Sequence, residues 1–240
     1  VPFYAALLAG ALAASLVSVI IGYPTLKAKL RSDYFAIATL GFGEAVRVIL
    51  ENLDITQGAR GLPGIAPYTD LTTVLAVAAV VIFLARNFVC SRFGRDAIAV
   101  REDYTAAEIM GINLFTVRMR SLIFSAATAG LSGGLFAHYV SFIQPAMFTS
   151  TLSTQLTAAV VAGGMGSLTG PIMASLIFVA IPEVLRVANI WRLVAYGFLL
   201  VAIMVLRPQG LFGFREVSLA SFKRLFANRR GGAGDVTTRA

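Results

Sequence analysis

The sequence is poor in charged residues and in the side chains that build catalytic or metal sites. Only 13% of its 240 residues are charged, whereas about a quarter are charged in a soluble domain. There is one cysteine, Cys90, and one histidine, His138. A disulfide within the chain is therefore excluded, and no spacing of cysteine and histidine suggests a zinc site. A membrane enzyme needs a constellation of nucleophile, base or metal ligands, so we expect no catalytic activity, metal or cofactor.

Long apolar stretches account for most of the chain, which is 58% hydrophobic. One bilayer crossing needs about 20 mostly apolar residues. The candidate spans are Pro2–Gly22, Tyr34–Leu53, Leu71–Val89, Ser121–Phe142, Leu152–Ala162, Ile172–Val187 and Leu193–Leu206. The fifth is short and contains several polar residues. The predicted fold is all-α, a polytopic transmembrane helical bundle of about seven spans. Because Val1 is not methionine and enters an apolar run at once, we expect the chain to be truncated at its N-terminus.

The positive charges are distributed unevenly over the predicted loops. With seven crossings, one side carries these residues: Lys27, Lys29, Arg31, Arg86, Arg92, Arg95, Arg101, Arg118, Arg120, Arg207, Arg215, Lys223, Arg224, Arg229 and Arg230. The opposite loops hold only Arg60, Arg186 and Arg192. Cationic loops lie on the cytoplasmic side, so we expect a cytoplasmic C-terminus. Topology then explains the net charge of +8 without nucleic acid. We predict a transmembrane domain over residues 1–214 and a disordered, basic tail over 215–240, whose basic residues bind anionic membrane lipid or hold the C-terminus in the cytoplasm.

The second candidate span contains an acidic residue near its middle, Glu44, and Arg47 follows one helical turn later on the same face. A charge at mid-bilayer costs several kcal/mol and is usually kept for a pathway or an ion pair. Glu44 therefore either lines a polar translocation route or forms a structural pair with Arg47 that closes against neighbouring helices. Gly41 and Gly43 permit close helix approach or a local break in the helix.

The central loop contains a predicted helix from Asp96 to Met110, closed by Gly111 as a left-handed cap residue. One apolar face is defined by spacing of three and four residues: Ala97, Val100, Tyr104, Ala107 and Gly111. Such a helix lies flat on lipid headgroups or inserts into a groove on a partner. Its polar sides contain three acids as well as Arg101, which favours docking to a protein: Glu102, Asp103 and Glu108.

Two glycine-rich segments are typical of packing and turns. Gly130 and Gly134 form a GxxxG pair that lets a neighbouring helix approach closely, and nearby His138 is expected to form an interfacial or inter-helix hydrogen bond. Residues Gly163–Pro171 lack the lysine and the strand–turn–helix context of a phosphate loop. This segment is predicted to be a tight turn, so any ATP must bind to a separate subunit.

Four segments resemble the branched-chain amino-acid ABC-transporter permeases, in the same order and across almost the whole chain. They are Tyr34–Glu44, Arg101–Asn113, Gly163–Pro171 and Arg207–Phe212. The chain is most similar to the second permease subunit of the pair, which is related to urea-type permeases. The resemblance implies an importer in the bacterial inner membrane that moves branched-chain amino acids by alternating access. It also implies a second permease subunit, two ATP-binding subunits on the cytoplasmic side and a periplasmic substrate-binding protein.

The resemblance and the residue patterns together predict two sets of functional residues. The substrate pathway is assigned to Thr39, Gly41, Gly43, Glu44 and Arg47. Coupling to the ATPase is assigned to Arg101, Glu102, Asp103, Tyr104, Ala107 and Gly111, in a coupling helix over about residues 96–111.

Other functions remain open at this stage. Related permeases are associated with urea, other amino acids or aromatic acids. An ion-coupled secondary transporter needs a relay of intramembrane carboxylates, and only Glu44 lies clearly at mid-span, since Glu183 is nearer an end. A purely structural membrane subunit is a further alternative.

Overall fold

The computed structural model describes residues 2–28, 32–164, 166–184, 197 and 205. The chain forms two compact units, Val1–Ser150 and Thr151–Ala240. The long helices of the first unit are α1 (Phe3–Lys27), α2 (Ser32–Asn52), α3 (Leu71–Cys90) and α6 (Leu114–Val140), and its shorter ones are α4 (Arg92–Glu102) and α5 (Tyr104–Ile109). The second unit contains α7 (Ser150–Gly163) and α8 (Thr169–Val184). The described part of the chain is thus mostly helical, as predicted.

The helices agree with six of the seven candidate spans. The seventh, Leu193–Leu206, lies almost entirely outside the described residues, as does the predicted tail from residue 215. By length and composition, α1 and α3 are the two described helices that could each cross a membrane. The count of seven spans therefore stays a prediction.

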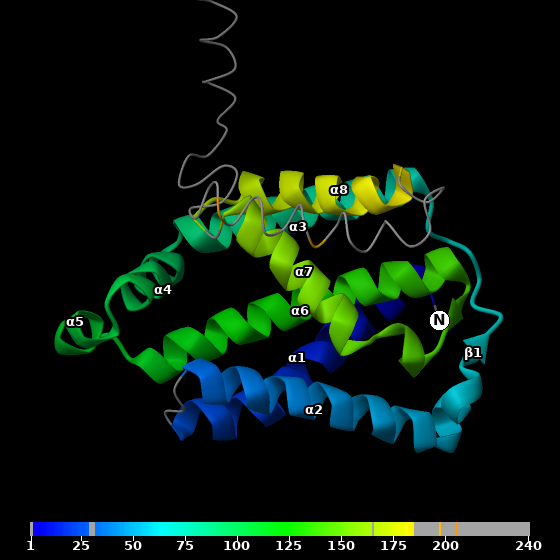
Figure 1. Cartoon of the computed structure of the whole chain (residues 1–240), viewed down its shortest axis with the longest axis horizontal. Helices are drawn as coiled ribbons and strands as arrows, with labels where there is room; N and C mark the ends of the chain where they lie inside the picture. The colour runs from blue at the N-terminus through cyan, green and yellow to red at the C-terminus, as the bar shows by residue number, and fades with distance from the viewer. Residues whose placement is uncertain (1, 29–31, 165, 185–196, 198–204, 206–240) are drawn as a thin grey trace, which may run out of the picture. The chain divides into compact units, whose positions relative to one another are not determined.

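Helices α1 and α6 pack side by side through small residues (Figure 1). A β-carbon placed on Gly134 would lie 2.7 Å from the Leu7 side chain, and one on Gly22 would lie 2.5 Å from Leu122. Glycine at these positions lets the two helices come close enough for dispersion contacts, which drive helix association where lipid is as apolar as the side chains. The predicted role of the GxxxG pair is confirmed.

The two ends of the α1–α6 pair carry different structures. At one end lie α4 and α5, and at the other lies a small two-stranded antiparallel sheet (Figure 1). Its strands are β1 (Leu62–Pro63) and β2 (Phe142–Ile143), with Leu62 opposite Ile143. The 3₁₀ turns η1 (Asp54–Thr56) and η2 (Gly58–Arg60) precede β1, and η3 (Pro145–Met147) follows β2. These two strands are the described exception to an all-α fold.

His138 holds the loop between β1 and α3 against the end of α6. Its Nδ1 lies 2.8 Å from the carbonyl oxygen of Ala66. The imidazole ring also packs against Phe3 of α1 and Tyr68 of the loop, with ring centroids 5.0 and 6.0 Å away. The expected hydrogen bond of His138 therefore forms, and its partner lies in a loop of the same chain and not in a second helix.

In the second unit, α7 and α8 are joined by the glycine-rich turn. A β-carbon on Gly163 would lie 2.6 Å from the backbone of Gly170, so the two helix ends touch through their main chains. The hydroxyl of Ser167 accepts a hydrogen bond from the Gly170 amide at 3.2 Å. Farther along, α7 and α8 share an apolar cluster: Ala159, Ala162, Ala174 and Phe178. The segment is a tight turn between helices, as predicted.

Candidate functional site

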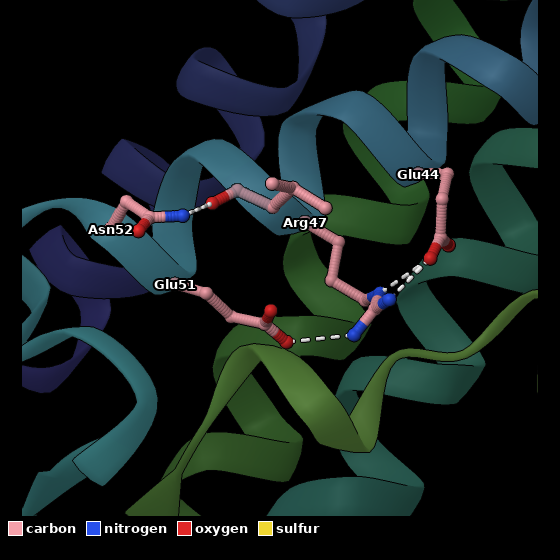
Figure 2. Close-up of polar contacts among 5 residues, drawn as sticks. Glu44, Arg47, Glu51 and Asn52 are labelled. Atoms are coloured by element: carbon pink, nitrogen blue, oxygen red, sulfur yellow. Dashed lines mark hydrogen bonds and ion pairs between the residues drawn. The ribbon is translucent and has the colours of Figure 1, made fainter.

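An arginine on α2 bridges two acidic residues of the same helix (Figure 2). The guanidinium of Arg47 pairs with Glu44, and its Nε lies 3.0 Å from Glu44 Oε1. Its Nη1 lies 2.7 Å from Glu51 Oε1. The spacings of three and four residues place all three side chains on one face of the helix. The face carries a net charge of −1, with both signs within one helical turn of each other.

This charged face is exposed mainly at Glu44. The side chain of Glu44 is 48% exposed, while those of Arg47 and Glu51 are about a quarter exposed. The predicted ion pair therefore forms, with Arg47 mostly buried and Glu44 half-exposed. A charged group exposed on a membrane helix normally faces a partner or a water-filled cavity rather than lipid.

The glycines beside Glu44 leave the helix intact. Helix α2 runs from Ser32 to Asn52 without interruption, so the alternative of a local break is wrong. A β-carbon on Gly41 or Gly43 would meet nothing within 4 Å in the described structure. The helix surface at Gly41 and Gly43 is therefore open, and it is available to a second protein or a solute. Thr39 contributes little polarity, because its hydroxyl donates to the carbonyl oxygens of Phe35 and Ala36 in its own helix.

The prediction of a single helix over residues 96–111 is wrong, because the helix is interrupted at Asp103. Helix α4 ends at Glu102 and α5 begins at Tyr104. Asp103 has an extended backbone, with φ −150° and ψ 108°, and its Oδ1 accepts hydrogen bonds from the amides of Thr105 and Ala106 at 2.8 and 3.0 Å. These amides at the start of α5 have no carbonyl partner within the helix, and the carboxylate satisfies them. The predicted coupling segment is therefore two short helices separated by Asp103.

The end of α5 is closed as predicted. Gly111 has φ +82°, a left-handed conformation that glycine adopts without strain. The amide of Gly111 donates to Glu108 and that of Ile112 donates to Ala107, both at 3.0 Å. This pair of hydrogen bonds is a Schellman motif, which satisfies the last carbonyls of the helix and turns the chain back towards α6.

The apolar face of α4 and α5 is divided between a buried part and an exposed part. Val100 and Ala107 are buried against Val117 at the start of α6. Tyr104, expected on the same face, is 61% exposed, and the neighbouring Ile109 and Met110 are 81% and 80% exposed. The prediction missed Ile109 and Met110 as candidates, although two adjacent apolar residues before a capping glycine are visible in the sequence. These three exposed apolar residues make up the exposed edge of α5.

The charged members of the predicted coupling set lie beside this edge. Arg101 and Glu102, the last residues of α4, form an exposed ion pair with Nη2 2.5 Å from Oε1. Asp103 is used in capping. Among the described residues no three His, Cys, Asp or Glu side chains are grouped so that they could hold a metal ion.

Comparisons with known proteins point to one family. A family model described as "Branched-chain amino acid transport system / permease component" matches residues 1–206. The permease protein LivM of a high-affinity branched-chain amino acid transport system in Escherichia coli is 33% identical over 87% of this chain and 57% of its own length. The protein of the same name from Salmonella typhimurium is 34% identical over 80% of this chain and 53% of its own length. A probable branched-chain amino acid transport permease protein from Methanocaldococcus jannaschii is 24% identical, covering 82% of this chain and 65% of its own length.

The chain spans about half the length of the two bacterial relatives that it matches. No solved structure matches it.

Proposed function

The chain belongs to the branched-chain amino acid transport permease family, and on that premise we propose that it is the membrane-spanning subunit of an ATP-driven importer of branched-chain amino acids. The carrying observation is the family match over residues 1–206, together with two relatives at 33–34% identity that are named for this transport. In this proposal the subunit lies in the bacterial inner membrane with its C-terminus in the cytoplasm. A second permease subunit, two ATP-binding subunits and a periplasmic substrate-binding protein complete the importer.

The α4–α5 pair is the part that contacts the ATP-binding subunit. The exposed edge of Tyr104, Ile109 and Met110 offers apolar side chains of residues that are 61–81% exposed. Short helices that present apolar side chains dock into hydrophobic grooves on their partners. The exposed Arg101–Glu102 pair flanks the edge and supplies polar contacts at its rim.

The same pair is joined to the long helices, so a push on it is transmitted into the membrane. Val100 and Ala107 pack on Val117 of α6. The guanidinium of Arg120 on α6 lies 4.4 Å from the centre of the Phe93 ring on α4, a distance within the range of a cation–π contact. Because α6 packs along α1, movement of α4 and α5 tilts these helices together, which is how alternating access would be driven.

The charged face of α2 contributes to the substrate pathway. An amino acid carries an ammonium and a carboxylate group, and Glu44 and Arg47 present the complementary charges on one helix face. The exposed Glu44 and the open surface at Gly41 and Gly43 face the second permease subunit, so that substrate passes along the interface between the two. Pairing within the protein keeps both charges compensated when no substrate is present.

The test is uptake of radiolabelled leucine by cells that produce the full-length protein, with and without the ATP-binding subunit. Leucine uptake that depends on the ATP-binding subunit is the expected result. Urea is assayed in parallel, and uptake of urea in place of leucine would keep the importer architecture and reject the amino-acid substrate. Uptake that persists without the ATP-binding subunit, and that an uncoupler abolishes, would reject the ATP-driven class in favour of an ion-coupled transporter.

A further inference from the structure

A cavity of about 1420 Å³ opens between the end of α1, the beginning of α6 and the α4–α5 pair. It is lined from five helices of the first unit, α1, α2, α4, α5 and α6. It is distinct from the charged face of α2, but it adjoins the exposed edge of α5, because Tyr104 and Arg101 also line it. Two other charged residues of the lining, Lys27 and Arg118, belong to neither the predicted pathway nor the predicted coupling set.

The charges around the cavity are mainly positive. Lys27, Arg101 and Arg118 line it, and Glu108 is the acidic residue in the lining. Arg101 is paired with Glu102. Lys27 and Arg118 have no acidic partner among the described residues. Lys27 instead donates a hydrogen bond to the Tyr23 hydroxyl at 3.1 Å. The cavity therefore has two cations, one from α1 and one from α6, with no acidic partner among the side chains that the structure describes, which favours an anionic occupant.

The rest of the lining combines apolar side chains with hydroxyl groups. Phe35, Phe115 and Leu122 provide apolar surface, while Ser121 and Ser125 contribute hydroxyl groups. A free inorganic anion needs only the polar part of such a site. A ligand with a charged head and an apolar body matches both parts of the lining.

The position along α1 indicates where in the membrane the cavity lies. Helix α1 has 25 residues, about 37 Å at 1.5 Å per residue, and is long enough to cross the hydrocarbon core of about 30 Å. Lys27 is the last residue of this helix. Its ammonium lies 5.2 Å from the centre of the Tyr23 ring, which itself packs edge-on against Phe115 at 5.8 Å. Tyrosine and lysine at a helix end are typical anchors at the membrane–water interface, so the cavity lies at the level of the lipid headgroups.

We propose that this cavity binds the headgroup of an anionic phospholipid, with the phosphate compensating Lys27 and Arg118. Basic pockets between membrane helices on the cytoplasmic side are known to hold acidic headgroups. The apolar lining accommodates the beginning of the acyl chains. A lipid bound here contacts α1, α6 and the α4–α5 pair at once, so it ties the coupling helices to the long helices. The proposal depends on the chain being a membrane permease and not on which substrate it moves.

The experiment measures lipid retained by the assembled full-length complex. The complex is reconstituted into nanodiscs of phosphatidylcholine with a minor share of phosphatidylglycerol, then extracted into mild detergent, and the bound lipid is quantified by mass spectrometry. The wild type is expected to retain phosphatidylglycerol in excess over its share of the nanodisc. Each basic residue near an anionic surface contributes roughly a fivefold preference. The single variants Lys27→Gln and Arg118→Gln should therefore each lose about fivefold of the enrichment, and the double variant about 25-fold.

Two matched variants distinguish lipid binding in this cavity from general electrostatic attraction between the protein and anionic lipid. Arg86→Gln with Arg92→Gln removes the same charge from residues that do not line the cavity, and it should retain the enrichment. Lys27→Arg with Arg118→Lys keeps both charges and should also retain it, which shows that a loss in the glutamine variants reflects charge. Assembly of every variant with its partner subunits is checked by gel filtration.

Three outcomes would overturn the proposal. The first is equal retention by the wild type and the Lys27→Gln, Arg118→Gln double variant. The second is an equal loss in the control with Arg86 and Arg92 replaced, which would indicate non-specific attraction. The third is displacement of the lipid by millimolar inorganic phosphate or ATP, which would identify a soluble anion as the occupant.

Discussion

The carbonyl oxygen of Gly10 on α1 lies only 2.5 Å from the place that a β-carbon would occupy on Gly130 of α6. At this crossing the two backbones touch, because neither residue has a side chain to hold them apart. Ala11 and Ala14 complete the contact with other small groups. The pair α1–α6 is therefore a closely packed unit, and α4 and α5 pack against the beginning of α6.

Replacing Gly130 with alanine should destabilise this pair. The added methyl group overlaps the Gly10 carbonyl and the Ala14 side chain, and relief requires the helices to separate, at a cost of about 1–3 kcal/mol. Gly133 is the matched control, since a β-carbon there meets nothing within 4 Å. Gly133→Ala should be neutral or slightly stabilising, because alanine favours the helix over glycine. Thermal unfolding of the purified full-length protein measures both, and equal midpoints for the two variants would contradict the close contact.

Local patterns in the sequence predicted the helices and this contact well. The spacing of Gly130 and Gly134 predicts close helix packing even when the partner helix is unknown, since small residues one turn apart leave a groove on the helix surface. The end of the helix at Gly111 was also predicted correctly, because a glycine after an amphipathic stretch commonly ends a helix. Both predictions depend on residues close together in sequence, and no long-range contact had to be known.

The break between α4 and α5 at Asp103 could not be predicted from such local patterns. An aspartate in a charged stretch fits the surface of a continuing helix as well as the start of a new one. The choice depends on whether the carboxylate captures the amides of Thr105 and Ala106 while Val100 and Ala107 both reach Val117. That requirement comes from tertiary packing, which overrides local helix propensity. The exposure of Ile109 and Met110 could not be predicted either, because it also depends on tertiary packing.

The charged face of α2 was predicted in part. The spacing of Glu44 and Arg47 identified the ion pair, and the same rule applied to Glu51 would have identified the second one. The sequence did not reveal that the pair is exposed within this chain, because exposure depends on which other helices pack against α2.

Replacing Glu44 with glutamine should lower leucine uptake about tenfold if the residue lines the pathway, because the substrate ammonium loses its carboxylate partner. Glu51→Gln is the control, since Glu51 pairs with the same guanidinium but is less exposed, and it should have a smaller effect. Both are measured as initial rates of labelled leucine uptake, with the amount of assembled complex determined by blotting. Normal uptake in the Glu44→Gln variant would remove this residue from the pathway.

Removing the cap at Asp103 should loosen α5 without unfolding the membrane helices. Asp103→Ala leaves the Thr105 and Ala106 amides without their acceptor, at a cost of about 1 kcal/mol. Asp103→Asn keeps an oxygen in the same place and should retain most of the cap. Hydrogen–deuterium exchange over residues 104–111 is expected to be about fivefold faster in the alanine variant. Unchanged exchange there would show that the cap does not stabilise the helix.

The exposed edge of α5 provides the sharpest test of coupling. Ile109→Ser should leave folding unchanged, because a side chain that is 81% exposed loses little packing. It should nevertheless weaken binding of the ATP-binding subunit by about tenfold, since an apolar anchor buried at an interface typically contributes more than 1 kcal/mol. Ile98→Ser is the matched control, at an exposed isoleucine on α4 outside this edge. The measurement is co-purification of the ATP-binding subunit at increasing salt, followed by uptake. If Ile98→Ser weakens binding as much as Ile109→Ser, the edge at Tyr104, Ile109 and Met110 is not the docking site. If neither has an effect, contact must be made by another part of the chain.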